Sequence, residues 1–365
     1  MKVVGTIVEY NPFHNGHLYA IQEIKKRSNA DILVVVMSGD FTMRGNLSLF
    51  NKFEKTKQCL KAGIDLIIEL PFVYTVHNAD IFAKRAIELL ALAKVDELWF
   101  GSETDDKNNI INLYNEWYKE HNQEKIKHLL KEGLSYKAAT AKIIDLNSND
   151  LLGFCYYKAI KDLNLKIKIN TIKRMGSNFN DLIPNQYASA YSIRNNLDLI
   201  NDYCPNFIDK TKIRNWDSIF IFLKFTILNQ TPSELKKYFM VDEGIENKLY
   251  QIINYHNFND FVDFLATKRY TKSRIQRMLL YVFFNITKEQ MVIINKEKPN
   301  FLRILGFSDK GLIYLKDLKK EILILTNLKN NLNSVLDINL KITKILDLFY
   351  LENEFKLEQS APIRE

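Results

Sequence analysis

Two of the chain's six histidines, His14 and His17, stand on either side of Gly16 in the segment 7–20, IVEYNPFHNGHLYA. A β-branched run ends at Glu9, a proline bends the chain, and a helical period begins near the glycine. Glycine lets the backbone approach a ligand closely, and the N–H groups at a helix start suit a phosphate. Two imidazoles can donate hydrogen bonds to phosphoryl oxygens as negative charge builds in a transition state. We therefore predict His14 and His17 as catalytic residues; two surface histidines in a helix-capping turn are the structural alternative.

A second candidate group follows the next predicted strand and should reach the same edge of the sheet. Ser38 and Gly39 can wrap a ligand, and Asp40 comes directly after them. Arg44 and Lys52, a little further on, could neutralise phosphate or RNA. We predict a ligand-binding rim here. An ordinary strand-to-helix turn with Asp40 as the helix N-cap is the alternative.

Several collinear motifs resemble one known family. The H-x-G-H turn at 14–17 indicates a nucleotidyltransferase superfamily, and NPFHNGH at 11–17, MSGDF at 37–41, RG at 44–45, ELP at 69–71 and FGSE at 100–103 together resemble the tRNA(Met) cytidine acetate ligase family. The likeness covers nearly the whole chain. It implies an enzyme that uses ATP, with Mg²⁺ carried by the nucleotide, to activate acetate as acetyl-adenylate. The acetyl group would then form N4-acetylcytidine at the wobble position of elongator tRNA(Met).

The resemblance also implies an ATP site. Its residues would be Ile7, Val8, Glu9, Tyr10, Asn11, Pro12, Phe13, His14, Asn15, Gly16, His17, Leu18, Tyr19, Ala20, Gly101, Asn149, Arg174, Ser189 and Arg194. Among them, Arg174 and Arg194 would bind phosphates, and Gly101 would lie on the adenine side. Asn149 could instead be a helix N-cap, and residues 189–194 a capped helix with a surface arginine. The rim at 38–40 is the candidate acetate contact.

One basic stretch stands out in the second half of the chain. Residues 267–277, TKRYTKSRIQR, carry no acid and five basic side chains: Lys268, Arg269, Lys272, Arg274 and Arg277. Arg274 and Arg277 share one face of a predicted helix. A basic helix with a tyrosine and several hydroxyls suits RNA phosphates. We predict that this stretch binds tRNA together with Arg44 and Lys52; a solvated helix face is the alternative.

The elements that must position these residues alternate in type along the first half. Strands are predicted at 3–8, 32–37, 66–70, 98–100 and 166–173, and helical periods lie at 18–27, 52–62 and 80–92. This alternation predicts an α/β fold with a Rossmann-like parallel sheet covered on both faces. From about residue 200 long helical periods dominate. We therefore predict a nucleotidyltransferase-like, ATP- and acetate-activating domain at 1–203 and a mostly α-helical, tRNA-binding domain at 204–365.

Composition narrows the cellular setting. The 365 residues include 51 basic and 43 acidic side chains, a formal charge of +8, which permits but does not require a polyanionic partner. Three widely spaced cysteines without a CxxC pair form neither a disulfide framework nor a zinc site, which suits the cytoplasm. No stretch reaches the ~20 apolar residues of a membrane helix. We expect no protein-held metal, no membrane contact and no obligate protein partner.

Two other functions remain open from the residues alone. A cofactor-type adenylyltransferase would join AMP to a small phosphorylated substrate. The helical second half argues against this function, because such enzymes are usually compact single domains. A non-catalytic RNA-binding factor would have no use for His14, Gly16, His17 and Arg194.

Overall fold

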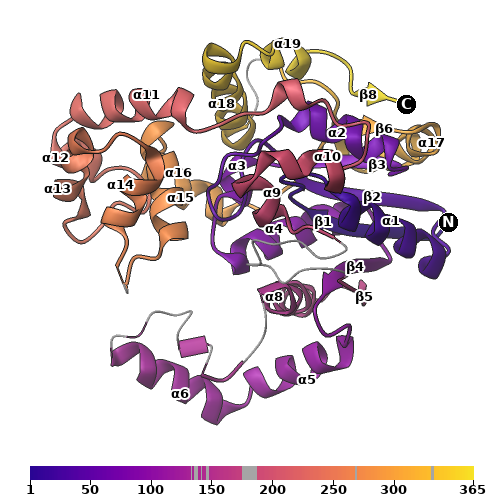
Figure 1. Ribbon diagram of the computed structural model, residues 1–365. Coiled ribbons are helices and arrows are strands. Elements are labelled where there is room, and N and C mark those ends of the chain that lie inside the picture. The colour runs from indigo at the N-terminus through magenta and orange to yellow at the C-terminus, as the bar shows by residue number, and fades with distance from the viewer. Residues whose placement is uncertain are drawn as a thin grey trace.

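A twisted sheet with helices on both faces forms the centre of the protein in a computed structural model (Figure 1). The structure describes residues 1–132, 134, 139–140, 142–144, 148–174, 187–267, 269–329 and 333–365. Within these ranges the sheet has eight strands in the order β5-β4-β1-β2-β3-β6-β7, with β8 beside β6. The strands are β1 (Val3–Val8), β2 (Ile32–Ser38), β3 (Leu66–Leu70), β4 (Glu97–Ser102), β5 (Lys168–Lys173), β6 (Phe301–Phe307), β7 (Leu323–Leu325) and β8 (Ile363–Arg364).

The first five strands are parallel, and the order reverses at β1, which lies between β4 and β2. A ligand site in such a sheet lies beyond the carboxyl ends of the strands at this switch point. Helices α1 (Asn15–Ser28), α2 (Lys52–Lys61), α4 (Ala79–Leu92) and α8 (Ser148–Asp162) connect or cover these strands, together with the short α3 (Phe72–Thr75). The predicted α/β fold with a parallel sheet is confirmed.

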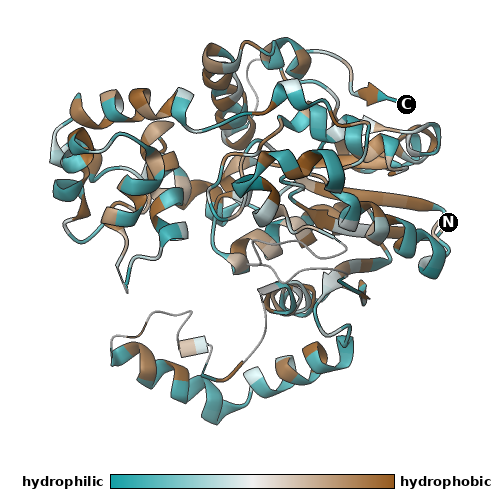
Figure 2. Ribbon diagram, viewed as in Figure 1, coloured by the Kyte–Doolittle hydropathy of each residue, from teal (hydrophilic) through white to brown (hydrophobic). Residues whose placement is uncertain are grey.

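Two hydrophobic clusters lie on opposite faces of the sheet, because successive strand residues point to opposite sides. On β2, Val34 and Val36 pack into the cluster that holds α4 and α8, whereas Val35 and Met37 pack into the cluster that holds α1 and α2. Figure 2 shows the strands as hydrophobic and the outer faces of α1 and α6 as hydrophilic. Continuous apolar strands are therefore explained by burial on both faces.

The second half supplies most of the remaining helices. They are α9 (Ala190–Asn195), α10 (Ile200–Tyr203), α11 (Asp217–Leu228), α12 (Pro232–Leu235), α13 (Ile245–Leu249), α14 (Phe258–Leu265), α15 (Lys272–Phe283), α16 (Lys288–Lys296), α17 (Asp309–Leu318), α18 (Ser334–Tyr350) and α19 (Glu354–Glu358). Helices α11 to α16 gather at one side of the sheet, while α5 (Lys107–Trp117) and α6 (Glu120–Lys131) extend from another (Figure 1). Among the described residues, no helix is both long and apolar enough to cross a membrane.

The chain after residue 300 differs from the expected helical second half. Strand β6 pairs antiparallel with β3, joining Leu66 to Phe307, and β7 and β8 pair with β6. Strands β6, β7 and β8 therefore extend the sheet formed by β1 to β5. Between residues 217 and 296 the described elements are the helices α11 to α16 and a short 3₁₀ helix at Tyr250–Asn254.

Candidate active site

The turn after β1 is built around the two histidines. His14 is the N-cap of α1: its Nδ1 accepts a hydrogen bond from the Gly16 N–H at 3.1 Å, and His17 Nδ1 accepts one from the His14 N–H at 3.3 Å. A Cβ added to Gly16 would lie 3.0 Å from His14 Cε1. Glycine is therefore favoured at position 16, because the imidazole of the N-cap packs against it. The backbone of Tyr10 has a φ of 46°, in the left-handed region, and this conformation turns the chain after β1.

Both imidazoles are held neutral. Their rings stack with centroids 3.6 Å apart. Burial, followed by the charges of Arg174 and Arg194, lowers the pKa of His14 to about 3. Burial, followed by His14 and Arg174, holds the pKa of His17 well below its usual value. Since Nδ1 accepts a backbone hydrogen bond in both rings, the proton is assigned to Nε2. Each histidine can thus donate one hydrogen bond without carrying charge.

Two arginines lie beside the histidines. Arg194 Nη1 donates to the Asn11 carbonyl at 2.5 Å, which ties α9 to the turn after β1. Arg174 follows β5, and its Nη1 lies 3.8 Å from Glu103 Oε1. Burial lowers the pKa of both guanidinium groups, yet both stay charged at neutral pH. The arginines add positive charge to a site whose histidines are neutral, as an anionic ligand requires.

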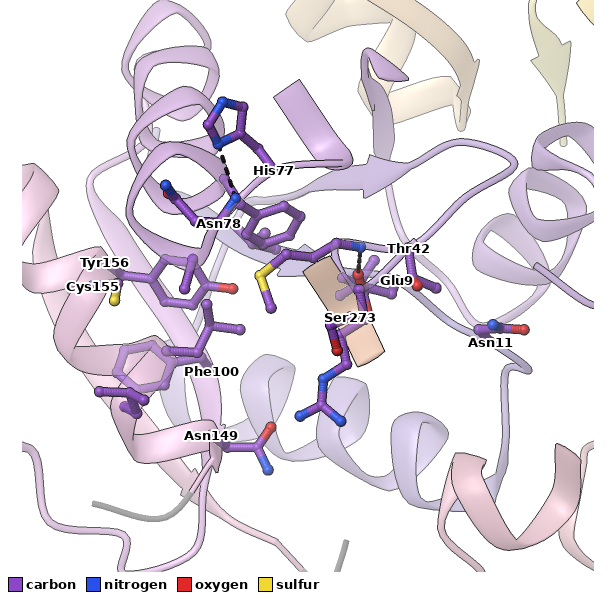
Figure 3. A pocket seen from close by; sticks show the side chains of 18 of the residues that line it. Glu9, Asn11, Thr42, His77, Asn78, Phe100, Asn149, Cys155, Tyr156 and Ser273 are labelled. Atoms are coloured by element: carbon purple, nitrogen blue, oxygen red, sulfur yellow. Dashed lines mark hydrogen bonds between the residues drawn. The ribbon is translucent and has the colours of Figure 1, made fainter. Parts of the chain in front are cut away.

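Asn149 lines the cavity and also connects two elements of the fold. Its Nδ2 donates to Glu103 Oε1 at 2.5 Å, while Asp150 accepts from Thr104 Oγ1 at 3.0 Å. These reciprocal contacts join the start of α8 to the loop after β4. They place the Asn149 side chain at the wall of the cavity (Figure 3).

One cavity of about 1490 Å³ brings most of the predicted site together. Its lining includes Ile7, Val8, Glu9, Tyr10, Asn11, His14, Gly16, His17, Tyr19, Ala20, Gly101, Asn149, Arg174, Ser189 and Arg194. Pro12, Phe13, Asn15 and Leu18 are not among the lining residues. Phe13 is fully buried in the core, and Asn15 Nδ2 donates to the Asp202 carbonyl at 3.4 Å. A single ligand site commonly has ~300–1,000 Å³, so this cavity has room for more than one substrate.

The residues of the predicted rim do not line this cavity. Ser38 is fully buried, and Asp40 accepts a hydrogen bond from Arg214 Nη1 at 2.9 Å. Neither these residues nor Gly39 are among the lining residues of the large cavity. Asp40 is thus bound by a charge network within the protein, which the sequence pattern did not reveal.

Lys52 also departs from its expected role at the surface. Its side chain is 2% exposed, and Nζ bonds Glu69 Oε1 at 2.8 Å as well as Glu358. Arg303 Nη2 bonds the other oxygen of Glu358 at 2.8 Å. An ammonium buried between two carboxylates cannot reach a tRNA phosphate, so Lys52 is a structural residue.

Sequence reasoning missed Lys55. This buried lysine donates from Nζ to the carbonyls of Glu9 at 2.9 Å, Ser38 at 2.8 Å and Gly39 at 2.6 Å. It thereby binds together the chain segments that leave β1 and β2. Burial is the main cause that lowers the pKa of Lys55 to about 8. In the sequence it reads as one more lysine on an amphipathic helix, and nothing local marks its burial.

The basic stretch reaches the same cavity from the other side. Arg44, Arg269, Lys272, Arg274 and Arg277 all line it, whereas Lys268 lies outside the described residues. The close view draws Ser273 of α15 among the lining residues, together with Glu9 and Asn149 (Figure 3).

Helix α15 is docked on the loop after β2. Gln276 Nε2 donates to Asn46 Oδ1 at 3.0 Å, and Arg277 Nη1 donates to the Met43 carbonyl at 3.4 Å. Gly45 lies between these contacts with a φ of +82°, and a Cβ there would come 2.7 Å from the Arg277 nitrogen. A side chain at position 45 would therefore push the basic helix away from the loop after β2.

Comparisons with known proteins identify the family of the chain. A family model described as HIGH Nucleotidyl Transferase matches residues 1–360. A tRNA(Met) cytidine acetate ligase of Lysinibacillus sphaericus is 38% identical, over 88% of each chain, and one of Fusobacterium nucleatum is 39% identical, over 87% of this chain and 85% of the relative.

Two crystal structures of Thermotoga maritima TmcAL share the fold. The apo form has a TM-score of 0.88 and the form bound with alpha-thio ATP a TM-score of 0.87; each is 28% identical and matches 100% of this chain and 99% of its own. The matches extend from the histidine turn through the basic helix to the strands near the C-terminus. The chain therefore belongs to the HIGH nucleotidyltransferase family and, within it, to the tRNA(Met) cytidine acetate ligases.

Proposed function

We propose that this protein uses ATP to activate acetate as acetyl-adenylate and then acetylates a cytidine of tRNA(Met). The observation that carries the proposal is the single cavity lined by the histidine–arginine group on one side and by basic residues of α15 on the other. Relatives of similar length bear the name of this activity. In full, the product is N4-acetylcytidine at the wobble position of the elongator tRNA, made in the cytoplasm.

In the first half-reaction an acetate oxygen attacks the α-phosphorus of ATP and pyrophosphate leaves. No protein nucleophile takes part, so rate comes from positioning and from stabilising charge. The Nε2–H groups of His14 and His17 donate to oxygens of the α-phosphate as negative charge grows there. Arg174 and Arg194 hold the departing phosphates. Neutral imidazoles suit this task because they require no proton transfer.

The metal ion of this reaction comes with the substrate. Mg²⁺ enters as the counter-ion of ATP and neutralises its phosphates. Among the described residues, no three His, Cys, Asp or Glu side chains are grouped so that they could hold a metal ion.

In the second half-reaction the exocyclic amine of cytidine attacks the acetyl carbon and AMP leaves. The base must leave its stack to reach the adenylate. Arg44, Arg269, Lys272, Arg274 and Arg277 attract the tRNA backbone to the mouth of the same cavity.

The direct test incubates the protein with ATP, ¹⁴C-acetate and an unmodified elongator tRNA(Met) transcript. We expect label in N4-acetylcytidine together with one AMP and one pyrophosphate for each acetyl group. Without tRNA, acetate-dependent exchange of pyrophosphate into ATP should persist. An adenylyltransferase would exchange pyrophosphate only with its own small phosphorylated substrate and would not respond to acetate, and a binding factor would not exchange it at all. Absence of acetate-dependent exchange would refute the proposal.

A further inference from the structure

The cavity extends beyond the nucleotide side to the opposite face of the sheet. Tyr10 and Phe13, which flank the histidine turn, belong to the hydrophobic cluster on the α1 face, whereas Phe100, Phe154 and Tyr156 belong to the cluster on the α4 and α8 face. Phe100, Phe154 and Tyr156 nevertheless line the same cavity as His14 and His17. The cavity therefore passes around the carboxyl ends of β1 and β4 and has a second, aromatic end.

Tyr156 is the polar group of this aromatic end. Its side chain is only 3% exposed, and its ring packs edge-on against Phe100 with centroids 5.7 Å apart. Figure 3 shows the hydroxyl pointing from α8 into the cavity, on the side of Glu9. Within the described part of the chain, no residue forms a hydrogen bond with this hydroxyl. A buried hydroxyl without a protein partner is expected to bind a ligand group.

Glu9 stands between the two ends of the cavity. Its Oε1 accepts a hydrogen bond from the Met43 N–H at 2.6 Å, which fixes the carboxylate at the end of β1. Among the described residues no hydrogen bond or ion pair reaches its second oxygen. The Glu9 charge acts on Arg194 on the nucleotide side and on Tyr156 on the other. Burial and, next, this carboxylate raise the pKa of Tyr156, so its hydroxyl stays protonated.

A fixed carboxylate beside a protonated hydroxyl matches a ligand that offers a donor and an acceptor side by side. The Watson–Crick edge of cytosine does so, with its N4 amine next to the N3 acceptor, and carboxylates are the usual partners of cytosine N4. Acetate fits poorly, because its negative charge would face that of Glu9. The aromatic wall of Phe100 and Tyr156 suits a flat, unstacked base.

We propose that this aromatic end is the pocket for the acceptor cytosine, in which Tyr156 donates to N3 and Glu9 accepts from the N4 amine. This inference rests on the proposed function. In the transfer step N4 forms a bond to the acetyl carbon, the bond from that carbon to the adenylate oxygen breaks, and AMP leaves with the electron pair. The proton lost from N4 passes to the Glu9 carboxylate and then to water.

The test measures the two half-reactions separately in Tyr156→Phe. This change removes only a hydroxyl that has no described protein partner, so the fold and the nucleotide side should remain. We expect acetate-dependent pyrophosphate exchange within twofold of the parent, with the KM for acetate unchanged, and acetyl transfer to the tRNA transcript slower by roughly tenfold or more. The matched control is Tyr157→Phe, because the next tyrosine of α8 packs on Tyr114 and does not line the cavity.

Three results would overturn the inference. Parental transfer by Tyr156→Phe would show that the hydroxyl does not touch the base. A higher KM for acetate would make this end the acetate pocket, and loss of exchange would assign Tyr156 to the nucleotide side. If the parent protein formed no acetyl-adenylate or no acetylcytidine, the proposed function itself would be refuted. That result comes from the parent protein alone and does not depend on the variant.

Discussion

His14 combines two tasks in one side chain. Its Nδ1 caps α1 through the Gly16 N–H, and this bond assigns the donor proton to Nε2. The types and spacing of His14, Gly16 and His17 were sufficient to predict a phosphate-binding turn. The neutral state of the rings was not predictable, because it depends on burial and on Arg174 and Arg194, which are far away in the sequence.

His14→Asn separates these tasks. Asparagine can still accept the hydrogen bond that caps the helix, but it has no nitrogen in the place of Nε2. We expect acetate-dependent pyrophosphate exchange to fall about a hundredfold or more, or about 3 kcal/mol in the barrier, as for other lost transition-state donors. The free energy of unfolding in urea should change by less than about 1 kcal/mol. Undiminished exchange would remove His14 from the chemistry.

Buried neutral histidines also predict how stability depends on pH. The pKa of His14 is about 3 and that of His77 about 4 in the fold, below the ~6.5 of an unfolded chain. As the pH falls below about 6.5, these histidines bind protons in the unfolded chain but not in the folded protein. Each of them therefore lowers the free energy of unfolding by about 1.4 kcal/mol per pH unit until the pH reaches its pKa in the fold.

Urea unfolding at pH 7.5 and 5.5 measures this loss. His77→Gln, which removes a titrating ring outside the histidine turn, should reduce the difference between the two pH values. An equal dependence of stability on pH in His77→Gln and in the parent protein would contradict the pKa argument.

At the scale of elements, helix α2 contains two buried lysines whose burial could not be predicted from the sequence. Lys52 and Lys55 sit on a helix with an amphipathic pattern, and lysines there are normally solvated. Both are buried because their partners come from other elements: Glu69 from β3, Glu358 from α19, and the carbonyls that follow β1 and β2. No local pattern in α2 could indicate contacts that only the tertiary fold creates.

Glu358→Gln tests the weight of this network. It would leave Lys52 and Arg303 buried with one carboxylate fewer, and loss of one partner from a buried pair typically costs about 3–5 kcal/mol. The matched control is Asp317→Asn, which breaks the exposed pair with Lys320 and should leave the free energy of unfolding nearly unchanged, because water screens that pair. Urea unfolding of both variants at pH 7.5 gives the two values, and similar small losses would show that the network contributes little.

At the scale of the whole molecule, the parallel strands β1 to β5 followed from local apolar runs and their alternation with helices. Strand β6 did not, since its partner β3 lies far upstream and the surrounding sequence is helical. The histidine turn and the basic helix were each predicted, but that they line one cavity depends on α15 docking on the loop at Gly45. The resemblance in sequence indicated the family, whereas the position of the basic helix relative to the histidine turn could be seen only in the structure.

Changes in the basic helix should weaken tRNA binding without changing the use of ATP. In Lys272→Ala with Arg274→Ala, the logarithm of tRNA affinity should depend less steeply on the logarithm of salt, by about two units for two lost phosphate contacts. Pyrophosphate exchange without tRNA should match the parent. Lys319→Ala with Lys320→Ala, directly after the distant helix α17, is the charge-matched control (Figure 1). Equal salt slopes in both double variants would show that α15 is a solvated face.

The pairing of Lys52 with Glu358 has a consequence for synthesis on the ribosome. The two residues are 306 positions apart, which at about 5–20 residues per second is a delay of roughly 15–60 s. For most of this time Lys52 lacks Glu358 and Glu69 lacks Arg303, and β3 is an open edge until β6 has been made. Exposed strand edges invite pairing with other chains. The nascent chain is therefore most exposed to aggregation while its second half emerges, and chaperone capture should peak in that interval and end once Glu358 is in place.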